Sequence, residues 1–557
     1  MRKHEKILLL TPPFVQLNTP YPATTQLVGW LASLGVAAEQ RDLSIEVALD
    51  VLRAYGPQPL TDEVISFLQG RSPDDAETLA EPGYLPEGPA FDSIAPEGTG
   101  LTRAEVLGGD PQGRAKVLCS LFLDDVAAAI RDEIDPDFGF SRYAEHLGAA
   151  VPDFDAVLRR LRRRSPIDRM LEERVAAALR STKPTIVGVT CPFPGTLLGA
   201  FRIARTVRKL APGVRLALGG GYVNTELRSL DDSRVGRFFD FVMYDEGYGP
   251  WCELLGLKAD VPPFVRPSYR GLDMSQYIDL AETANPMHRL WSDGRWIKIQ
   301  LARGCYWHKC AFCDVTLDYI KRFEMPPAAT VADAMEALSA ETSETGFHFT
   351  DEAIPPKLAR DLSRELIRRK FRFRWWGNVR FDASYTPELA RLMARAGCIA
   401  VTGGLECATD RLLKLMNKGI TLASARAALK AFSDAGILVH AYLMYAFPTQ
   451  TEREARAALR YVRDRFREGS VQSAFFHRFA LTVHSPIARS PEKFGIVVPE
   501  IPHPRNRVFA MNEIPYVEPG APDWDRIGRV LKLALYNYML GLGLDLPVDA
   551  WFRSPSA

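Results

Sequence analysis

Short apolar runs alternate with amphipathic helical patterns in the first part of the chain, and this alternation predicts a parallel α/β sheet. Patterns typical of helices lie at 24–34, 196–210 and 248–255. Runs typical of buried strands lie at 6–10, 36–43, 185–190, 214–218 and 239–244. Because strands that alternate with helices form parallel sheets covered on both faces, we expect residues 1–265 to form a doubly wound, Rossmann-like sheet of about five strands.

The same alternation recurs six times in the second part of the chain. The predicted strands are 296–301, 347–350, 373–379, 398–402, 436–445 and 471–481, with helical patterns between them. Six such units are too few to close an eight-stranded barrel, so residues 266–490 are expected to form a partial (β/α)6 barrel with functional groups at its carboxyl end. Residues 491–557 predict a Pro-rich loop and a small C-terminal helical tail, with a helix at 524–540.

A long insertion, residues 50–180, separates the two halves of the first sheet. Its middle, 71–113, is rich in Pro, Gly, Asp and Glu and predicts a loop, whereas 114–132 and 156–180 predict helices. The basic run at 159–164 predicts a solvated helix face rather than a phosphate site, because acidic residues follow it closely and no aromatic residues are interleaved. No chemistry is assigned to this insertion.

Composition and charge narrow the choice of partner. The 557 residues include 69 basic and 68 acidic side chains, so the net charge of +1 gives no reason to expect nucleic acid or a membrane surface as partner. A small-molecule or peptide substrate is favoured. No apolar run approaches the ~20 residues of a membrane helix. The scattered cysteines form no disulfide pattern, and a cytoplasmic location is predicted.

Three of the eight cysteines lie within nine residues, at Cys305, Cys310 and Cys313. A cysteine-rich loop that follows a predicted strand is typical of iron–sulfur binding, because thiolates are soft ligands. Three protein ligands would leave a fourth iron open for a substrate or cosubstrate. The alternative is a zinc site that borrows a fourth ligand, such as His308.

This loop resembles the signature of the radical S-adenosylmethionine (SAM) enzymes, in which cysteines spaced C-x3-C-x2-C hold a [4Fe–4S] cluster whose free iron binds SAM. Here four residues separate the first two cysteines, whereas the second spacing matches. Phe312 stands where the family has an aromatic or apolar residue near the adenine of SAM. The resemblance implies that Cys305, Cys310 and Cys313 each bind one iron.

Later strand ends are also similar to SAM-binding segments of this family. Asp351 and Glu352 follow the second predicted strand of the barrel, and Arg380 follows the third. After the fourth strand, Glu406 ends a Gly-Gly-Leu-Glu segment, and 412–419 resembles the helix that follows this segment in the cobalamin-associated members. The resemblance implies that Asp351, Glu352 and Glu406 contact SAM, and Arg380 offers a donor toward the SAM carboxylate or a substrate.

The first sheet is similar, in arrangement more than in letters, to the cobalamin-binding domain that precedes many radical SAM cores. The residues expected at its strand ends, and therefore beside cobalamin, are Gln16, Asn18, Thr190, Gly219, Gly220 and Gly221. Because the D-x-H-x-x-G motif is absent, the resemblance implies cobalamin bound without a protein imidazole on cobalt. A tight strand-to-helix turn that binds nothing is the alternative explanation of the glycines.

Taken with these motifs, the resemblance implies a radical SAM enzyme that uses a [4Fe–4S] cluster to cleave SAM and functionalise an unactivated carbon. Cobalamin-dependent methyl transfer is the leading expectation. The alternatives are a cyclisation, ring contraction or oxidation without methyl transfer, and, from another class, a non-catalytic metal-binding protein. An electron donor such as flavodoxin or ferredoxin is implied as a partner.

Overall fold

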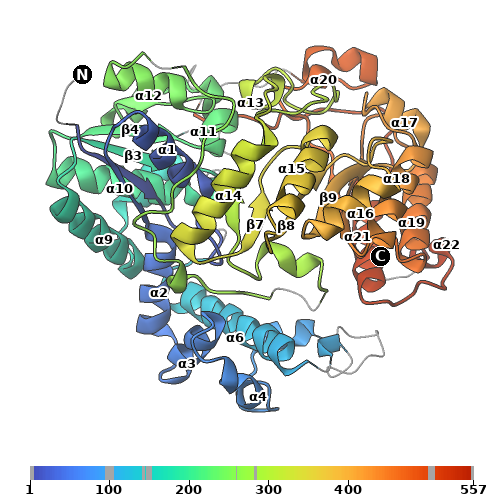
Figure 1. The fold of residues 1–557 in the computed structure, drawn as a ribbon, viewed down its shortest axis with the longest axis horizontal. Helices are drawn as coiled ribbons and strands as arrows, with labels where there is room; N and C mark the ends of the chain where they lie inside the picture. Colours follow the sequence, from blue (N-terminus) through green and yellow to red (C-terminus); the bar gives the residue numbers. More distant parts are fainter. Residues whose placement is uncertain are drawn as a thin grey trace.

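The chain folds into two parallel sheets that lie side by side, with an inserted group of helices below them (Figure 1). The computed structural model describes residues 5–94, 106–108, 110–140, 145, 154–258, 260–281, 285–499 and 509–553. Within these ranges, no helix is both long and apolar enough to cross a membrane.

The first sheet has the strand order β2-β1-β3-β4-β5 and all its pairings are parallel. Its strands are β1 (Ile7–Thr11), β2 (Ala38–Asp42), β3 (Ile186–Thr190), β4 (Arg215–Gly219) and β5 (Phe241–Val242). Every residue of β1 and β3 is buried, which is why their sequences are continuous apolar runs rather than alternating ones. Helices pack on both faces, among them α1 (Pro22–Ser33), α10 (Leu197–Leu210) and α12 (Tyr248–Leu255). The predicted doubly wound sheet is confirmed.

The second sheet has the order β11-β10-β9-β8-β7-β6, also entirely parallel, and confirms the six predicted units. Its strands are β6 (Ile297–Ile299), β7 (Gly346–Phe349), β8 (Arg374–Val379), β9 (Cys398–Glu406), β10 (Leu438–Tyr445) and β11 (Ser473–Arg478). The helices that follow them are α14 (Ala328–Thr342), α15 (Pro356–Arg368), α16 (Pro387–Arg395), α18 (Leu422–Asp434) and α19 (Glu452–Arg467). Strand β9 runs four residues beyond its predicted end, because pairing with β10 continues to Glu406.

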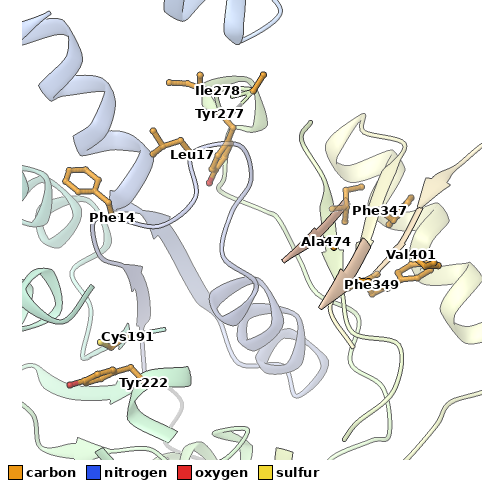
Figure 2. Close-up of a cluster of buried hydrophobic side chains, with 14 of the residues drawn as sticks. Phe14, Leu17, Cys191, Tyr222, Tyr277, Ile278, Phe347, Phe349, Val401 and Ala474 are labelled. Carbon is orange, nitrogen blue, oxygen red and sulfur yellow. The ribbon is translucent and has the colours of Figure 1, made fainter. Parts of the chain in front are cut away.

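One apolar cluster extends through both units, and Figure 2 shows part of it. In this cluster Leu17, after β1, lies beside the segment that leads to the second sheet, where the Ile278 amide donates to the Leu17 carbonyl at 2.9 Å. Phe347 and Phe349 of β7 belong to the same cluster inside the second unit. The two sheets are therefore joined by a continuous apolar core as well as by the chain that connects them.

The insertion is more helical than its composition predicts. It contains α2 (Leu43–Tyr55), α3 (Leu60–Leu68), α4 (Ala76–Leu79), α6 (Pro111–Glu133), α8 (Asp155–Arg162) and α9 (Pro166–Thr182). The predicted loop at 71–113 is therefore wrong in part, although 95–105 and 109 lie outside the described residues. The helix predicted at 156–180 is two helices, because Ser165 and Asp168 form a capping box that starts α9 with Pro166 in its first turn.

The predicted solvated helix face at 159–164 is wrong for Arg160. Its side chain is only 9% exposed and pairs with Asp135 and Asp168, at 3.0 Å each, and with Asp137. Arg202 shares Asp168 at 3.0 Å. Burying a guanidinium is costly unless carboxylates surround it, so this run supplies a structural ion-pair network as well as exposed charges.

The C-terminal region returns across both units. Helix α21 (Trp524–Met539) confirms the predicted helix and packs against α19 and β11. Upstream of it, Phe509 stacks on Phe154 at the start of α8, with ring centroids 4.7 Å apart. Residues 500–508 and 554–557 of the predicted tail lie outside the described residues.

Candidate active site and cofactor pockets

A cavity of about 320 Å³ at the carboxyl ends of the second sheet brings together most of the site residues expected from the sequence. Its wall combines the cysteine loop with side chains in or just after the carboxyl-end halves of five strands, β7 to β11. The expected residues that line it are Cys305, Cys310, Cys313, Phe312, Glu352, Arg380 and Glu406. Others, to which the sequence assigned no SAM-binding role, are His308, Asn378, Lys418, Tyr442 and His477.

The three cysteines are free thiols around one cavity, and burial raises the pKa of Cys310 and of Cys313. Within the described part of the chain, no three His, Cys, Asp or Glu side chains converge tightly enough to share a single metal ion. A four-iron cluster bonds each cysteine to a different iron, so it needs thiolates spread around a space rather than at one point. The donor set fits such a cluster with one open iron.

The additional residue of the cysteine loop is accommodated by Trp307. Its indole N–H donates to the Asn417 carbonyl at 2.8 Å, and the Asn417 amide donates back to the Lys309 carbonyl at 2.8 Å. Gly419 packs closely against the indole, because a Cβ atom added there would be 2.1 Å from the ring. His308 turns the loop with φ of 38° and holds the Cys305 carbonyl through Nδ1 at 2.9 Å. The longer loop therefore docks onto the segment 417–419.

Glu406 forms a buried ion pair at the floor of the cavity. Its carboxylate lies 2.5 Å from the ammonium of Lys418, and both side chains are less than a tenth exposed. Burial is the largest effect and would lower the pKa of Lys418, but the charge of Glu406, the nearby Cys310 and the hydrogen bond to Glu406 together outweigh it, so the pKa is raised. Glycine at position 404 leaves room for this pair, because a Cβ atom there would be 1.9 Å from the Glu406 carboxylate and 2.7 Å from the Lys418 ammonium.

Arg380 lines the same cavity beside the Glu406–Lys418 pair. Its guanidinium lies 4.8 Å from the ring centroid of Trp307 and 5.8 Å from that of Tyr306, and it donates to the Lys418 carbonyl. Stacking on aromatic faces and a backbone acceptor fix the planar group in one orientation. Arg380 therefore connects the cysteine loop to the Glu406–Lys418 pair.

Asp351 and Glu352, expected to act together, have different surroundings. The two carboxylate oxygens of Asp351 accept the backbone N–H groups of Leu301 and Ala302 at 2.9 and 2.7 Å, and the side chain is fully buried outside the cavity. Asp351 therefore fixes the chain as it leaves β6, and the expected contact with SAM is corrected for this residue. Glu352 does line the cavity, where burial, with a smaller effect from Asp314, raises its pKa to about 7.

A second cavity, of about 210 Å³, lies at the first sheet and includes three of the expected cobalamin residues, Thr190, Gly219 and Gly220. Gly219 has room for a ligand, because the nearest atom to a Cβ there would be 3.7 Å away. Gly220 also lines the cavity, but its φ is 113° and a Cβ atom there would be 2.7 Å from the Cys191 backbone, so the fold already requires glycine. Gly221 lies outside it, against Pro192.

Gln16 and Asn18 lie away from both cavities, contrary to the expectation that they contact cobalamin. The Gln16 side-chain carbonyl accepts from the buried Lys298 ammonium at 2.7 Å. Asn18 donates to the carbonyls of Trp291 and Gly294 at 3.2 and 2.9 Å. The loop after β1 runs along the start of the second unit, so these amides join the units instead of facing a ligand.

The two cavities share a wall that consists of the chain on either side of the cysteines. Gln300 and Tyr319 of the second unit line the first-sheet cavity, and the Tyr319 hydroxyl donates to Asp314, next to Cys313, at 3.2 Å. On the other side Arg303 pairs with Glu246, which lines the same cavity, at 3.1 Å. Groups bound in the two cavities would therefore be neighbours.

Comparison with known proteins agrees with this geometry. Residues 299–462 match the model of the radical SAM superfamily, and this range contains the cysteine loop, Glu352, Arg380 and Glu406. Over this range the second unit is therefore similar to the radical SAM superfamily.

Curated relatives are similar at low identity. An uncharacterized methyltransferase of Pyrococcus horikoshii is 24% identical over 52% of this chain and 66% of its own length. Cytidylyl-2-hydroxyethylphosphonate methyltransferase of Streptomyces wedmorensis is 25% identical over 45% of this chain and 47% of its length. Anaerobic magnesium-protoporphyrin IX monomethyl ester cyclase of Cereibacter sphaeroides is 22% identical over 53% of this chain and 52% of its own length. The chain thus spans less than two thirds of each relative.

The fold of both units together also occurs in a solved structure. The radical SAM methyltransferase TsrM of Kitasatospora setae, solved with cobalamin and a [4Fe–4S] cluster bound, has a TM-score of 0.53 to this chain at 16% identity. The match covers 99% of this chain and 89% of TsrM. The pairing of a Rossmann-like sheet with a partial barrel is therefore shared with TsrM.

Proposed function

We propose that this protein is a cobalamin-dependent radical SAM methyltransferase. One observation supports the radical SAM part above all others. Three free cysteines of one loop and the side chains of Glu352, Arg380 and Glu406 line a single cavity at the carboxyl end of the partial barrel. A reduced [4Fe–4S] cluster held by these cysteines would supply one electron to cleave SAM into methionine and a 5′-deoxyadenosyl radical.

The remaining side chains of the cavity would orient SAM. Glu406 would accept a hydrogen bond from a ribose hydroxyl or the SAM ammonium while its ion pair with Lys418 holds the carboxylate in place. Burial holds the pKa of Glu352 near neutrality, so an ammonium placed beside it would favour the carboxylate form and gain a charge-assisted bond. Phe312 would cover an apolar edge such as the adenine, and Arg380 would face a carboxylate.

The cavity at the first sheet supports the cobalamin part of the proposal. Thr190, Gly219 and Glu246 would border a group that reaches toward the cysteine loop, and Gln300 and Tyr319 would close over it. None of the described residues that line this cavity is histidine, in agreement with a cobalt atom without a protein imidazole. Cobalamin would supply the methyl group.

A radical SAM reaction without methyl transfer is the second candidate. The observation that favours it is the similarity to a cyclase, which is as extensive along this chain as the similarity to the methyltransferases. In either case we infer a small-molecule or peptide substrate, no nucleic acid partner, and an electron donor such as flavodoxin or ferredoxin. Free cysteines and an oxygen-sensitive cluster favour the cytoplasm.

Anaerobic purification and reconstitution with iron and sulfide test the proposal. We expect a brown protein with charge-transfer absorption, about four irons per chain, cleavage of SAM on reduction, and cobalamin in the acid extract. The control is the variant Cys407→Ala, which removes a buried cysteine outside the loop and should keep all four properties. Absence of a cluster would refute radical SAM chemistry, and a cluster without any cobalamin binding would favour the second candidate.

A further inference from the structure

The longer cysteine loop brings an imidazole to the wall of the barrel cavity. His308 lies between the first two cysteines, where this chain has one residue more than the radical SAM spacing, and it lines the same cavity as all three cysteines. Its neighbours on both sides are held, because Trp307 donates to the Asn417 carbonyl and the Lys309 carbonyl accepts from the Asn417 amide, each at 2.8 Å. The imidazole therefore has a defined place beside the cysteines.

Only one of the two ring nitrogens of His308 has a protein partner. Nδ1 lies 2.9 Å from the Cys305 carbonyl, and because a carbonyl oxygen can only accept, Nδ1 carries a proton and donates it. Among the described residues, none is hydrogen-bonded to Nε2. A histidine that binds a metal through Nε2 normally donates its Nδ1–H to a backbone carbonyl or a carboxylate, which fixes the orientation of the ring. His308 therefore has the arrangement of a metal ligand.

A purely structural role explains histidine at this position less well. The φ of His308 is 38°, in the left-handed region that favours Gly and Asn. An Asn amide could donate to the same Cys305 carbonyl at a lower conformational cost. What histidine adds is a second nitrogen, and imidazole nitrogen is a good ligand for iron. A role in the turn alone therefore leaves Nε2 without a purpose.

We propose that Nε2 of His308 binds the fourth iron of the cluster when SAM is absent, and that SAM binds by displacing it. This inference rests on the proposed function and goes beyond it, because it gives the open iron an exchangeable protein ligand. In the exchange His308 gives up one iron–nitrogen bond, and the carboxylate and amine of SAM form two bonds to the same iron. The SAM ammonium loses one proton to solvent, and no electron is transferred. Four protein ligands would close the reactive iron to other molecules until SAM arrives.

The test identifies the nitrogen bound to the cluster without any turnover. Full-length protein is labelled with heavy nitrogen in histidine, reconstituted and reduced, and studied by pulsed electron paramagnetic resonance with and without an unlabelled, uncleavable SAM analogue. The variant His308→Asn keeps a residue that tolerates the turn and an amide donor for the Cys305 carbonyl, but it lacks Nε2. The matched control is His477→Asn, which removes the other described imidazole that lines the cavity.

Without the analogue, we expect a strong coupling from histidine nitrogen in the wild type and in His477→Asn, and none in His308→Asn. The analogue should replace this coupling by one from its own nitrogen. If the capped form holds about nine tenths of the wild-type protein, His308→Asn should lower the Kd for SAM about tenfold. A wild-type cluster without histidine coupling, or a coupling that survives in His308→Asn, would overturn the inference. Absence of any cluster in the wild type would instead refute the proposed function.

Discussion

The contact between Trp307 and Gly419 predicts a specific non-additive effect. Trp307→Ala removes the hydrogen bond to Asn417, about 1 kcal/mol, and the cation–π contact with Arg380, about 1 kcal/mol. Gly419→Ala adds a φ penalty of about 1–2 kcal/mol at +73° and displaces the indole, since its Cβ would lie 2.1 Å from the ring. In the double variant the ring is already absent, so only the φ penalty adds to the cost of Trp307→Ala.

The double variant should therefore be less destabilised than the sum of the single variants, by about 2 kcal/mol if Gly419→Ala displaces the ring fully. Hydrogen exchange of the peptide that contains the Ala311 amide reports the local opening free energy, which suits a chain of several units. Gly436→Ala is the control, because its φ is +79° but nothing lies within 4 Å of the added Cβ. A coupling below about 0.5 kcal/mol would refute the explanation that the Trp307 indole docks the longer loop against Gly419.

Four further outcomes are expected. Cys310→Ala should lose the intact cluster and SAM cleavage, and a full iron content with normal 5′-deoxyadenosine yield would contradict the ligand assignment. Glu406→Gln should weaken SAM binding by about 1–3 kcal/mol in calorimetry, and an unchanged affinity would limit Glu406 to its ion pair with Lys418. Asp351→Asn should lower the melting temperature, because one backbone N–H loses its acceptor at a cost of about 1–3 kcal/mol. The folded fraction should keep its SAM affinity. A selective loss of that affinity would show that Asp351 contacts SAM after all. Electron paramagnetic resonance of added Co(II) cobalamin should show no superhyperfine triplets from a protein nitrogen, and triplets that vanish on replacement of a histidine would disprove this.

The hydrophobic periodicity predicted both sheets, because their strands are buried apolar runs separated by regular helices. Such a pattern depends only on residues that are neighbours in the sequence. It also placed Glu352, Arg380 and Glu406 at strand ends, which parallel topology brings to one cavity. It could not separate Asp351 from Glu352, because both follow β7 and only the three-dimensional course of 301–302 supplies hydrogen-bond donors for one of them.

The same limit explains the errors outside the barrel. Gln16 and Asn18 follow a strand as a ligand-binding residue would, but the second unit, far away in sequence, supplies their partners, at Lys298 and Gly294. Arg160 appears in a run typical of solvated helices, yet carboxylates from two other segments bury it. Long-range ion pairs and amide contacts leave no periodic signal, so patterns in the sequence predict elements better than they predict which polar side chains stay free for ligands.

The wall shared by the two cavities gives the proposed chemistry a physical requirement. A methyl donor in the first-sheet cavity and a radical formed in the barrel must both reach one substrate carbon, so neither unit can act alone. The ion pair of Arg303 with Glu246 ties the chain just before Cys305 to the first unit, and the Tyr319 hydroxyl holds Asp314 within the loop that follows Cys313. Any movement of one unit relative to the other would therefore displace the residues proposed to hold the cluster. The continuous core between the sheets opposes such movement, and this rigidity, rather than any single side chain, would keep the two reactive groups at a fixed separation.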